Sequence, residues 1–123
     1  MERISVFLDD IRNAPDGYLR IETIDECIDI LQRFEIEHLS LDHDLVSKHR
    51  NGTLLVEMMI QKQLYANRIT IHSANAPRGK AMYNSFKQAQ LDSLMPLSIA
   101  ISLRPLPLWS YSDSVVKYYV DTF

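Results

Sequence analysis

The stretch ISVFLDDIR at residues 4–12 joins a short apolar run to two adjacent acids and an arginine. Two further segments have the same form, HLSLDHD at residues 38–44 and ITIHSAN at residues 69–75. Short apolar runs of this kind are typical of β-strands that are buried on both faces. Polar residues that follow such strands lie where the sheet opens onto solvent. The three segments therefore predict one shared site at the carboxyl ends of three strands.

The length of 123 residues, with 46% hydrophobic and 24% charged residues, predicts one domain over residues 1–123 with a core of its own. No stretch approaches the roughly 20 consecutive apolar residues that span a bilayer. The first residues enter a strand-like segment and show no signal-peptide pattern. We therefore expect a cytoplasmic protein without a membrane partner.

Cys27 is the only cysteine, so one chain can form neither an internal disulfide nor a thiolate metal cluster. The net charge of -3 argues against broad nucleic-acid binding, which needs a dense surface of lysine and arginine. A small phosphorylated ligand or the end of an RNA stays compatible with this charge, because local charge differs from the mean.

Strand and helix signals alternate along the chain. Turn formers fill residues 13–17 and exclude a full helix between the first two strands. Thr23 and Glu26 have the spacing of a capping box, and Thr53 is expected to cap the next helix. The predicted strands are 4–8, 18–21, 38–41, 68–71 and 97–103, and the predicted helices are 24–34, a helix from Thr53, 77–90 and a helix from Ser112.

This alternation predicts an α/β fold with a mainly parallel sheet, right-handed crossovers and helices on both faces. The expected fold class is a doubly wound, flavodoxin-like, five-stranded sheet of order 2-1-3-4-5, with the first helix replaced by a loop. In that order, the first, third and fourth strands are neighbours. Their carboxyl ends then lie side by side across roughly 10 Å, which is room for a phosphate and a metal ion.

The acids after the first and third strands suit a hard divalent cation. Asp9, Asp10 and Asp42 are the predicted ligands, and magnesium or manganese is the expected cofactor, since both prefer oxygen donors and keep waters that a phosphate can displace. Alternatively, these acids only begin solvated loops and accept hydrogen bonds from backbone amides.

Two histidines lie among the acids. Asp42 and Asp44 flank His43, and carboxylates in such positions can orient an imidazole for proton transfer. His72 supplies a second imidazole one strand away. Opening a cyclic phosphate needs one group to activate water and another to protonate the leaving oxygen, so His43 and His72 are candidate base and acid. For His72, a core histidine bonded to the backbone is the alternative.

Three further residues are candidates for binding a substrate phosphate: Arg12, Ser73 and Asn75. A guanidinium can bind a phosphate through two hydrogen bonds, and Arg12 accompanies the paired acids. It can instead pair with Asp16 or another acid and brace its loop. The basic run at residues 48–50 is either solvated surface or a lid over an anionic substrate.

The motifs together resemble the cyclic-phosphate processing receiver family. They are FLDDIR (7–12) with Pro15 and Gly17, SLDHDL (40–45), and IHSAN (71–75) with Gly79 and Met82. The resemblance implies a receiver-like fold, an acidic pocket of Asp9, Asp10 and Asp42, and histidines peculiar to the family. Val46 departs from the glycine that commonly follows DHDL in similar members, and a β-branched residue disfavours positive φ there.

The leading hypothesis is a phosphoesterase that processes a cyclic phosphate on a nucleotide or RNA end with an acidic pocket and two histidines. One alternative is a receiver-like regulatory module that binds phosphate or is phosphorylated at Asp42, although Arg104-Pro105 stands where a receiver usually has a lysine. Another is a non-catalytic binder of cyclic nucleotides. Trp109, Tyr111, Tyr118 and Tyr119 can stack on a base, but we expect them to pack the last helix onto the sheet or onto a second subunit in a homo-oligomer.

Overall fold

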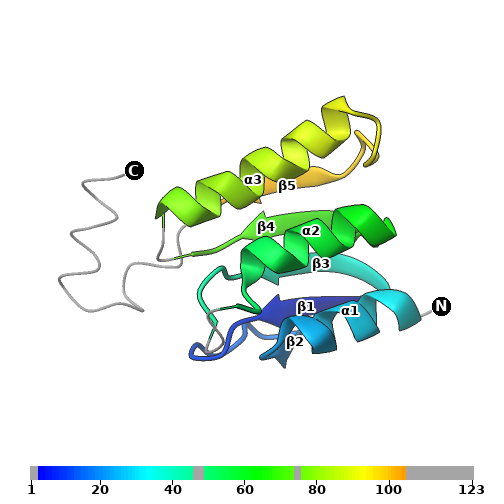
Figure 1. The fold of residues 1–123 in the computed structure, drawn as a ribbon. Helices are drawn as coiled ribbons and strands as arrows, with labels where there is room; N and C mark the ends of the chain where they lie inside the picture. Colours follow the sequence, from blue (N-terminus) through cyan, green and yellow to red (C-terminus); the bar gives the residue numbers. More distant parts are fainter. Residues whose placement is uncertain (1–2, 46–48, 74–75, 105–123) are drawn as a thin grey trace.

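The computed structural model describes residues 3–45, 49–73 and 76–104 of the chain. Strands and helices alternate through these residues after the first two strands (Figure 1). The strands are β1 (Arg3–Leu8), β2 (Tyr18–Ile21), β3 (Glu35–Leu41), β4 (Arg68–Ile71) and β5 (Ala100–Leu103), and the helices are α1 (Ile24–Arg33), α2 (Gly52–Lys62) and α3 (Ala76–Leu91). Within the described residues, no helix has the length and apolar character that crossing a membrane requires.

The five strands form one parallel sheet of order β2-β1-β3-β4-β5, which confirms the predicted order. The connections through α1, α2 and α3 all advance in the same direction across the sheet. Right-handed crossovers that advance in one direction place their helices on one face, and Figure 1 shows the three helices on that face. The step from β1 back to β2 passes through residues 9–17 without a helix, as predicted.

The core lies between the sheet and the three helices. Alternate strand residues point toward the helices, and Val6, Leu8, Leu39 and Leu41 are almost fully buried there. The helices contribute equally buried side chains, with Phe86 from α3 among them. A shift of one residue in any strand would turn these side chains away from the core. The apolar pattern therefore fixes the register, and with it the positions of the strand ends.

The second face of the sheet carries polar side chains. His38 of β3 contacts the hydroxyl of Tyr18 through Nδ1 and the hydroxyl of Thr70 through Nε2, the latter at 2.7 Å. Burial and the nearby guanidinium of Arg68 lower the pKa of His38 below its ordinary value. The predicted covering of both faces is not found among the described helices, because α1, α2 and α3 all lie on the opposite face. The helix expected from Ser112 lies outside the described residues.

Three strand starts differ from the prediction, and the first does so by one residue, since β1 begins at Arg3 and not at residue 4. β3 begins at Glu35 and not at residue 38, because the chain pairs with β1 from Arg3 onward across a register shift. β5 begins at Ala100 and not at residue 97. The buried amide of Gln90 donates hydrogen bonds to the carbonyls of Pro96 and Ile99, both at 2.9 Å, and these bonds hold the preceding residues in a turn.

The helix starts follow capping chemistry. The predicted capping box of α1 is confirmed, since Thr23 Oγ1 accepts the Glu26 N–H at 3.2 Å and the Glu26 carboxylate accepts the Thr23 N–H. The predicted cap of α2 is wrong: Asn51, and not Thr53, accepts the Leu54 N–H at 3.2 Å. α3 begins at Ala76, one residue before the predicted start.

Candidate functional site

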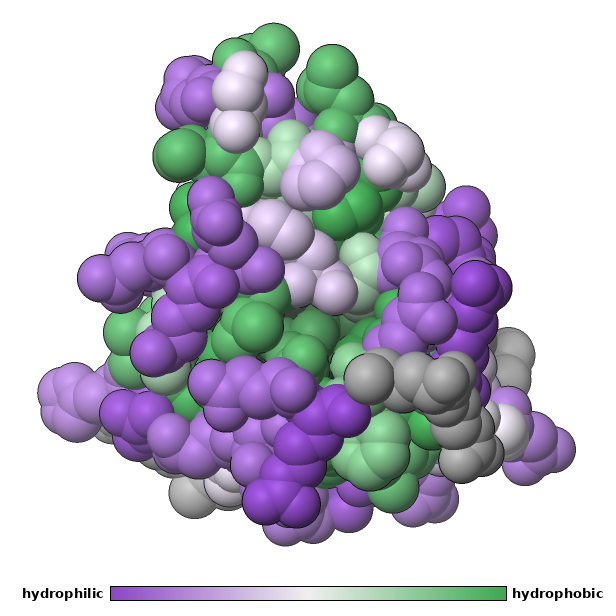
Figure 2. Space-filling model, turned by 90° about the vertical axis from the view of Figure 1, so that its right-hand side faces the viewer, coloured by the Kyte–Doolittle hydropathy of each residue, from purple (hydrophilic) through white to green (hydrophobic). Residues whose placement is uncertain are grey.

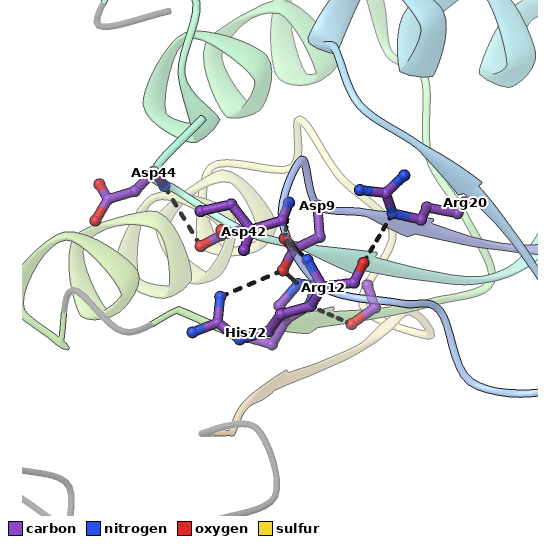
Figure 3. Close-up of polar contacts among 8 residues, drawn as sticks. Asp9, Arg12, Arg20, Asp42, Asp44 and His72 are labelled. Carbon is purple, nitrogen blue, oxygen red and sulfur yellow. Dashed lines mark hydrogen bonds and ion pairs between the residues drawn. The ribbon is translucent and has the colours of Figure 1, made fainter. Parts of the chain in front are cut away.

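Three carboxylates meet at the carboxyl end of the sheet. Leu8 of β1 pairs with Leu41 of β3, so the residues that follow each strand, Asp9 and Asp42, are brought to the same edge. One oxygen from each of Asp9, Asp10 and Asp42 can be chosen so that all three lie within 4.8 Å of one another. Asp9 is fully buried, Asp42 is 4% exposed and Asp10 is half-buried. The predicted set of metal ligands is thus a real cluster (Figure 3).

The Asp9 carboxylate is held by hydrogen bonds. Its Oδ1 accepts the backbone N–H groups of Ile11 and Arg12, each at 2.9 Å. Its Oδ2 lies 3.2 Å from His72 Nε2 and 3.7 Å from Arg12 Nη1. Burial alone would raise the pKa of Asp9, but the hydrogen bonds from His72 and from the two amides outweigh it and lower that pKa. Asp9 is therefore ionised at neutral pH.

The pKa of Asp42 is shifted in the opposite direction. Burial, and then the negative charge of Asp9, raise its pKa to about 7. The hydrogen bond from the Asp44 N–H to Asp42 Oδ1 is long at 3.4 Å and offsets little of this. Figure 3 shows the Asp44 carboxylate pointing away from the pair of acids. Among the described residues, Asp42 is thus a buried carboxylate whose charged neighbour, Asp9, disfavours its ionised form.

The acidic cluster fits a hard divalent cation. Its donors are carboxylate oxygens, which magnesium and manganese prefer. Burial and the charge of Asp9 raise the pKa of Asp42, so a cation held between the two acids would favour the ionised form of Asp42. An acidic triad of this kind is typical of the metal site of receiver domains. Asp9, Asp10 and Asp42 are the residues that would hold the ion.

His72 is locked in place at the end of β4. Its ring is 2% exposed and stacks on the ring of Phe7, with centroids 4.3 Å apart and planes 5° apart. Nδ1 lies 2.6 Å from Ser40 Oγ, and Nε2 faces Asp9. Burial lowers the pKa of His72, and the hydrogen bond to Asp9 only partly opposes this. The imidazole is therefore neutral at pH 7, with both nitrogens engaged.

His43 is also buried, at 7% exposure, but among the described residues only one of its ring nitrogens has a hydrogen-bond partner. Nδ1 lies 2.6 Å from Asp44 Oδ1, while Nε2 has no hydrogen-bond partner within the described part of the chain. The backbone here packs against the first residue of α2, since Gly52 donates its N–H to the His43 carbonyl at 3.0 Å. A Cβ at position 52 would lie 2.6 Å from the Asp42 carbonyl oxygen, so only glycine permits this approach.

The other predicted site residues differ in their distance from the acids and in whether the structure describes them. Arg12 pairs with Asp9 and not with Asp16, and its carbonyl accepts a hydrogen bond from Arg20 Nε at 2.8 Å. Ser73 follows His72 and is buried, 3% exposed. Asn75 lies outside the described residues.

The basic run at residues 48–50 shows no lid in its described part. Arg50 Nε and Nη2 bind the two carboxylate oxygens of Asp25 on α1, at 2.9 and 2.5 Å. Position 48 lies outside the described residues. Arg50 therefore ties the connection between β3 and α2 to the neighbouring helix.

The sequence prediction missed three residues that build the site, namely Phe7, Ser40 and Gly52. Phe7 and Ser40 each lie two positions before a predicted site acid, so strand alternation places them on the same face as that acid. This signal was available in the sequence. Gly52 follows the asparagine that caps α2, but its role depends on the approach of α2 to Asp42, which only the packed structure defines.

The fold and the site together define a class. A parallel sheet of order 2-1-3-4-5, with a cluster of acids after β1 and β3, is a receiver-like architecture with its acidic pocket. The chain belongs to the family described as Cyclic-phosphate processing Receiver domain, which it matches over residues 4–88. The match confirms the resemblance predicted from the three motifs. Comparison with curated proteins finds no match.

Proposed function

We propose that this protein opens a cyclic phosphate on a nucleotide or at an RNA end to give a phosphate monoester. The observation that carries the proposal is the cluster of Asp9, Asp10 and Asp42 at the end of the sheet. Two buried imidazoles lie beside it, His43 next to Asp42 and His72 at the end of β4. Membership of a family described by cyclic-phosphate processing supports it. Such a cluster handles an anionic substrate only with a cation to offset its charge.

The reaction sets the requirements for the side chains. Water adds to the phosphorus, and one ring P–O bond breaks to give a monoester and a free hydroxyl. The attacking water loses a proton to a base, and the departing oxygen gains one from an acid. A divalent cation on the three acids would stabilise the negative charge that develops on the phosphate oxygens during the reaction. The residues must therefore hold that ion and move two protons.

We assign proton transfer to His43. The Asp44 carboxylate can only accept a hydrogen bond, so it orients the ring with the hydrogen on Nδ1 and leaves Nε2 as the acceptor. Nε2 is buried and has no hydrogen-bond partner among the described residues, so it can bind the attacking water or the leaving oxygen. Asp44 is then the residue that fixes the tautomer, in the manner of the carboxylate in a hydrolase triad.

Arg12 and Ser73 are the proposed contacts to the phosphate oxygens, with Asn75 as a third. The Arg12 side chain is 24% exposed and its guanidinium lies 3.7 Å from the Asp9 carboxylate, so it is next to the acidic cluster without being fully buried. A guanidinium in that position can donate two hydrogen bonds to one phosphate. Arg12 would therefore bind the substrate while its N–H keeps Asp9 in place.

The experiment is phosphorus NMR of the purified chain with 2′,3′-cyclic and 3′,5′-cyclic nucleotides and with a short RNA ending in a cyclic phosphate, each with and without magnesium or manganese. We expect conversion to monoester with the ion present. His43→Ala should lower turnover by about 10²–10⁴-fold, whereas His49→Ala, which removes an exposed histidine of the same connection, should leave it unchanged.

Two other results would replace the proposal. If the wild type is inert on every substrate and acetyl phosphate labels Asp42, the protein is a phosphate-accepting regulatory module. If calorimetry detects tight binding of a cyclic nucleotide that is recovered intact, it is a non-catalytic binder.

A further inference from the structure

The contacts of His72 leave it no route to a substrate. Its ring is 2% exposed, and Ser40, Asp9 and Phe7 contact both nitrogens and one ring face. A proton carrier must meet the reacting oxygen directly or through one water. His72 would have to give up its contact with Ser40 or Asp9 to do so. Its function must therefore be sought in the groups that it contacts.

Hydrogen bonds are donated in one direction along these residues, from Ser40 to His72 and from His72 to Asp9. The ionised Asp9 carboxylate only accepts hydrogen bonds, so His72 Nε2 carries the hydrogen and donates it at 3.2 Å. In a neutral ring, Nδ1 is then an acceptor, and the hydroxyl of Ser40 donates to it at 2.6 Å. The Ser40 hydroxyl thereby fixes the tautomer that lets His72 donate to Asp9.

The hydrogen bonds on Asp9 also determine how it can bind an ion. A carboxylate has about four lone-pair positions. Two on Oδ1 are used by the N–H groups of Ile11 and Arg12, and one on Oδ2 is used by His72. The Arg12 guanidinium lies farther from Oδ2, at 3.7 Å, which is beyond hydrogen-bond distance. One position on Oδ2 is therefore left for an ion, and the other three contacts fix its direction.

We propose that Ser40, His72 and Phe7 form a positioning unit that holds the Asp9 carboxylate in the orientation for a divalent cation. Each of the three acts through Asp9 and contacts neither ion nor substrate. This inference rests on the cation site of the proposed function and assigns His72 a role different from proton transfer. Groups that orient a metal ligand commonly contribute 10–100-fold, as an order of magnitude, to metal affinity.

The same sheet face contains a matched control. Thr70 of β4 is the register neighbour of Ser40 and forms the equivalent hydroxyl–imidazole contact, to His38 Nε2 at 2.7 Å. The other nitrogen of His38 contacts the phenol of Tyr18, so this second pair does not reach an acid of the site. Removing the Thr70 hydroxyl therefore perturbs the face in the same way without touching Asp9.

The test is the affinity of Mn²⁺ for the full chain, measured by electron paramagnetic resonance or calorimetry. We expect Ser40→Ala to weaken binding by about tenfold and His72→Phe by about 10–100-fold. Thr70→Ala should change it by less than twofold. His72→Gln, whose amide can still donate toward Asp9, should recover most of the affinity, a rescue that a purely packing role would not produce.

Several outcomes would overturn the inference. Unchanged affinity in Ser40→Ala and His72→Phe would do so, and so would an equal loss in Thr70→Ala. If His72→Phe does not fold, Ser40→Ala still decides, because it removes one hydroxyl. If His72→Gln binds Mn²⁺ with full affinity but has no turnover, His72 is a proton carrier and not a positioning residue. If the wild type turns over cyclic phosphates but the variants bind Mn²⁺ as tightly as it does, the positioning unit is ruled out and the proposed function stands.

Discussion

Gln90 and Asp42 are both buried polar side chains, at opposite ends of the same sheet. At the amino end, the Gln90 amide donates to two carbonyls of the connection between α3 and β5. At the carboxyl end, Asp42 lies beside a second carboxylate, and its pKa is raised to about 7. Among the described residues, the Gln90 amide therefore has two close acceptors, whereas Asp42 has a like charge beside it. The contrast separates a polar contact that maintains the fold from one that the fold tolerates.

The two ends of the sheet also differ in which side chains they expose and which they bury. Figure 2 shows the amino end, where apolar side chains gather in the upper part above a rim of hydrophilic ones. Leu94 and Leu97 are exposed there and line a hollow of about 520 Å³ with Tyr65 and Gln90. The carboxyl end instead buries acids and histidines. Unfavourable electrostatics that persist in a folded protein are typical of functional sites.

The largest expected effect is a gain of stability at the site. The unfolded pKa of Asp42 is near 3.8 and the folded pKa is about 7, so the ion-free protein loses stability as pH rises through that interval. Asp42→Asn should therefore raise the free energy of unfolding by roughly 2–4 kcal/mol above pH 7 and by little at pH 4. Urea denaturation without metal measures this, with the exposed Asp16→Asn as control. Destabilisation at pH 8 would contradict the contrast.

Gly52→Ala should act on the same end with the opposite sign. Its Cβ would meet the Asp42 carbonyl oxygen at 2.6 Å, so α2 must move away from the site. We expect a loss of about 2–3 kcal/mol and weaker binding of Mn²⁺. Thr53→Ala, one position along, should change stability by less than about 0.5 kcal/mol. Equal effects of the two substitutions would show that the close approach of α2 is unimportant.

Gln90→Ala tests the amino end. The variant leaves the carbonyls of Pro96 and Ile99 without their donor, so the protein should lose about 1–2 kcal/mol. Turnover of cyclic phosphates should not change, because the acids lie at the other end. Gln88→Ala, on the exposed side of α3, serves as the control. A gain of stability in Gln90→Ala would show that the buried amide at the amino end does not stabilise the fold, contrary to the contrast with Asp42.

Acid should destabilise the fold modestly through two histidines. The pKa values of His72 and His38 are lowered by burial, so the unfolded chain binds these protons first and stability falls as pH drops below about 6.5. At pH 6 each contributes under about 1 kcal/mol. The measurement is made in the Asp42→Asn variant, because the Asp42 carboxyl would otherwise increase stability as pH falls and mask the effect of the histidines. A free energy of unfolding that stays flat from pH 8 to 5.5 in this background would contradict both assignments.

The sequence predicted the sheet order and the acidic cluster because each depends on local patterns. Apolar runs that end in acids identify the strand ends, and the turn-rich residues 13–17 exclude the first helix. The order then brings the carboxylates together without any knowledge of side-chain packing. Asp9 and Asp42 follow paired residues of neighbouring strands, so their proximity is a consequence of register.

What the sequence did not predict depends on long-range contacts. The difference between His43 and His72 arises from Ser40 and Phe7, which lie 32 and 65 positions before His72 in the chain. The late start of β5 depends on the reach of the Gln90 amide from α3. A spacing pattern identifies residue types at strand ends, whereas the partners of each nitrogen and oxygen are defined only when the strands pack.

The most direct test of the account compares the effect of magnesium on wild type and Asp42→Asn at pH 8. If the acids form a cation site, magnesium at about ten times its dissociation constant should stabilise the wild type by about 1–2 kcal/mol. The same concentration should leave Asp42→Asn unchanged, since that variant has lost both the ligand and the repulsion. Equal stabilisation of the two proteins, or none in the wild type, would contradict the account.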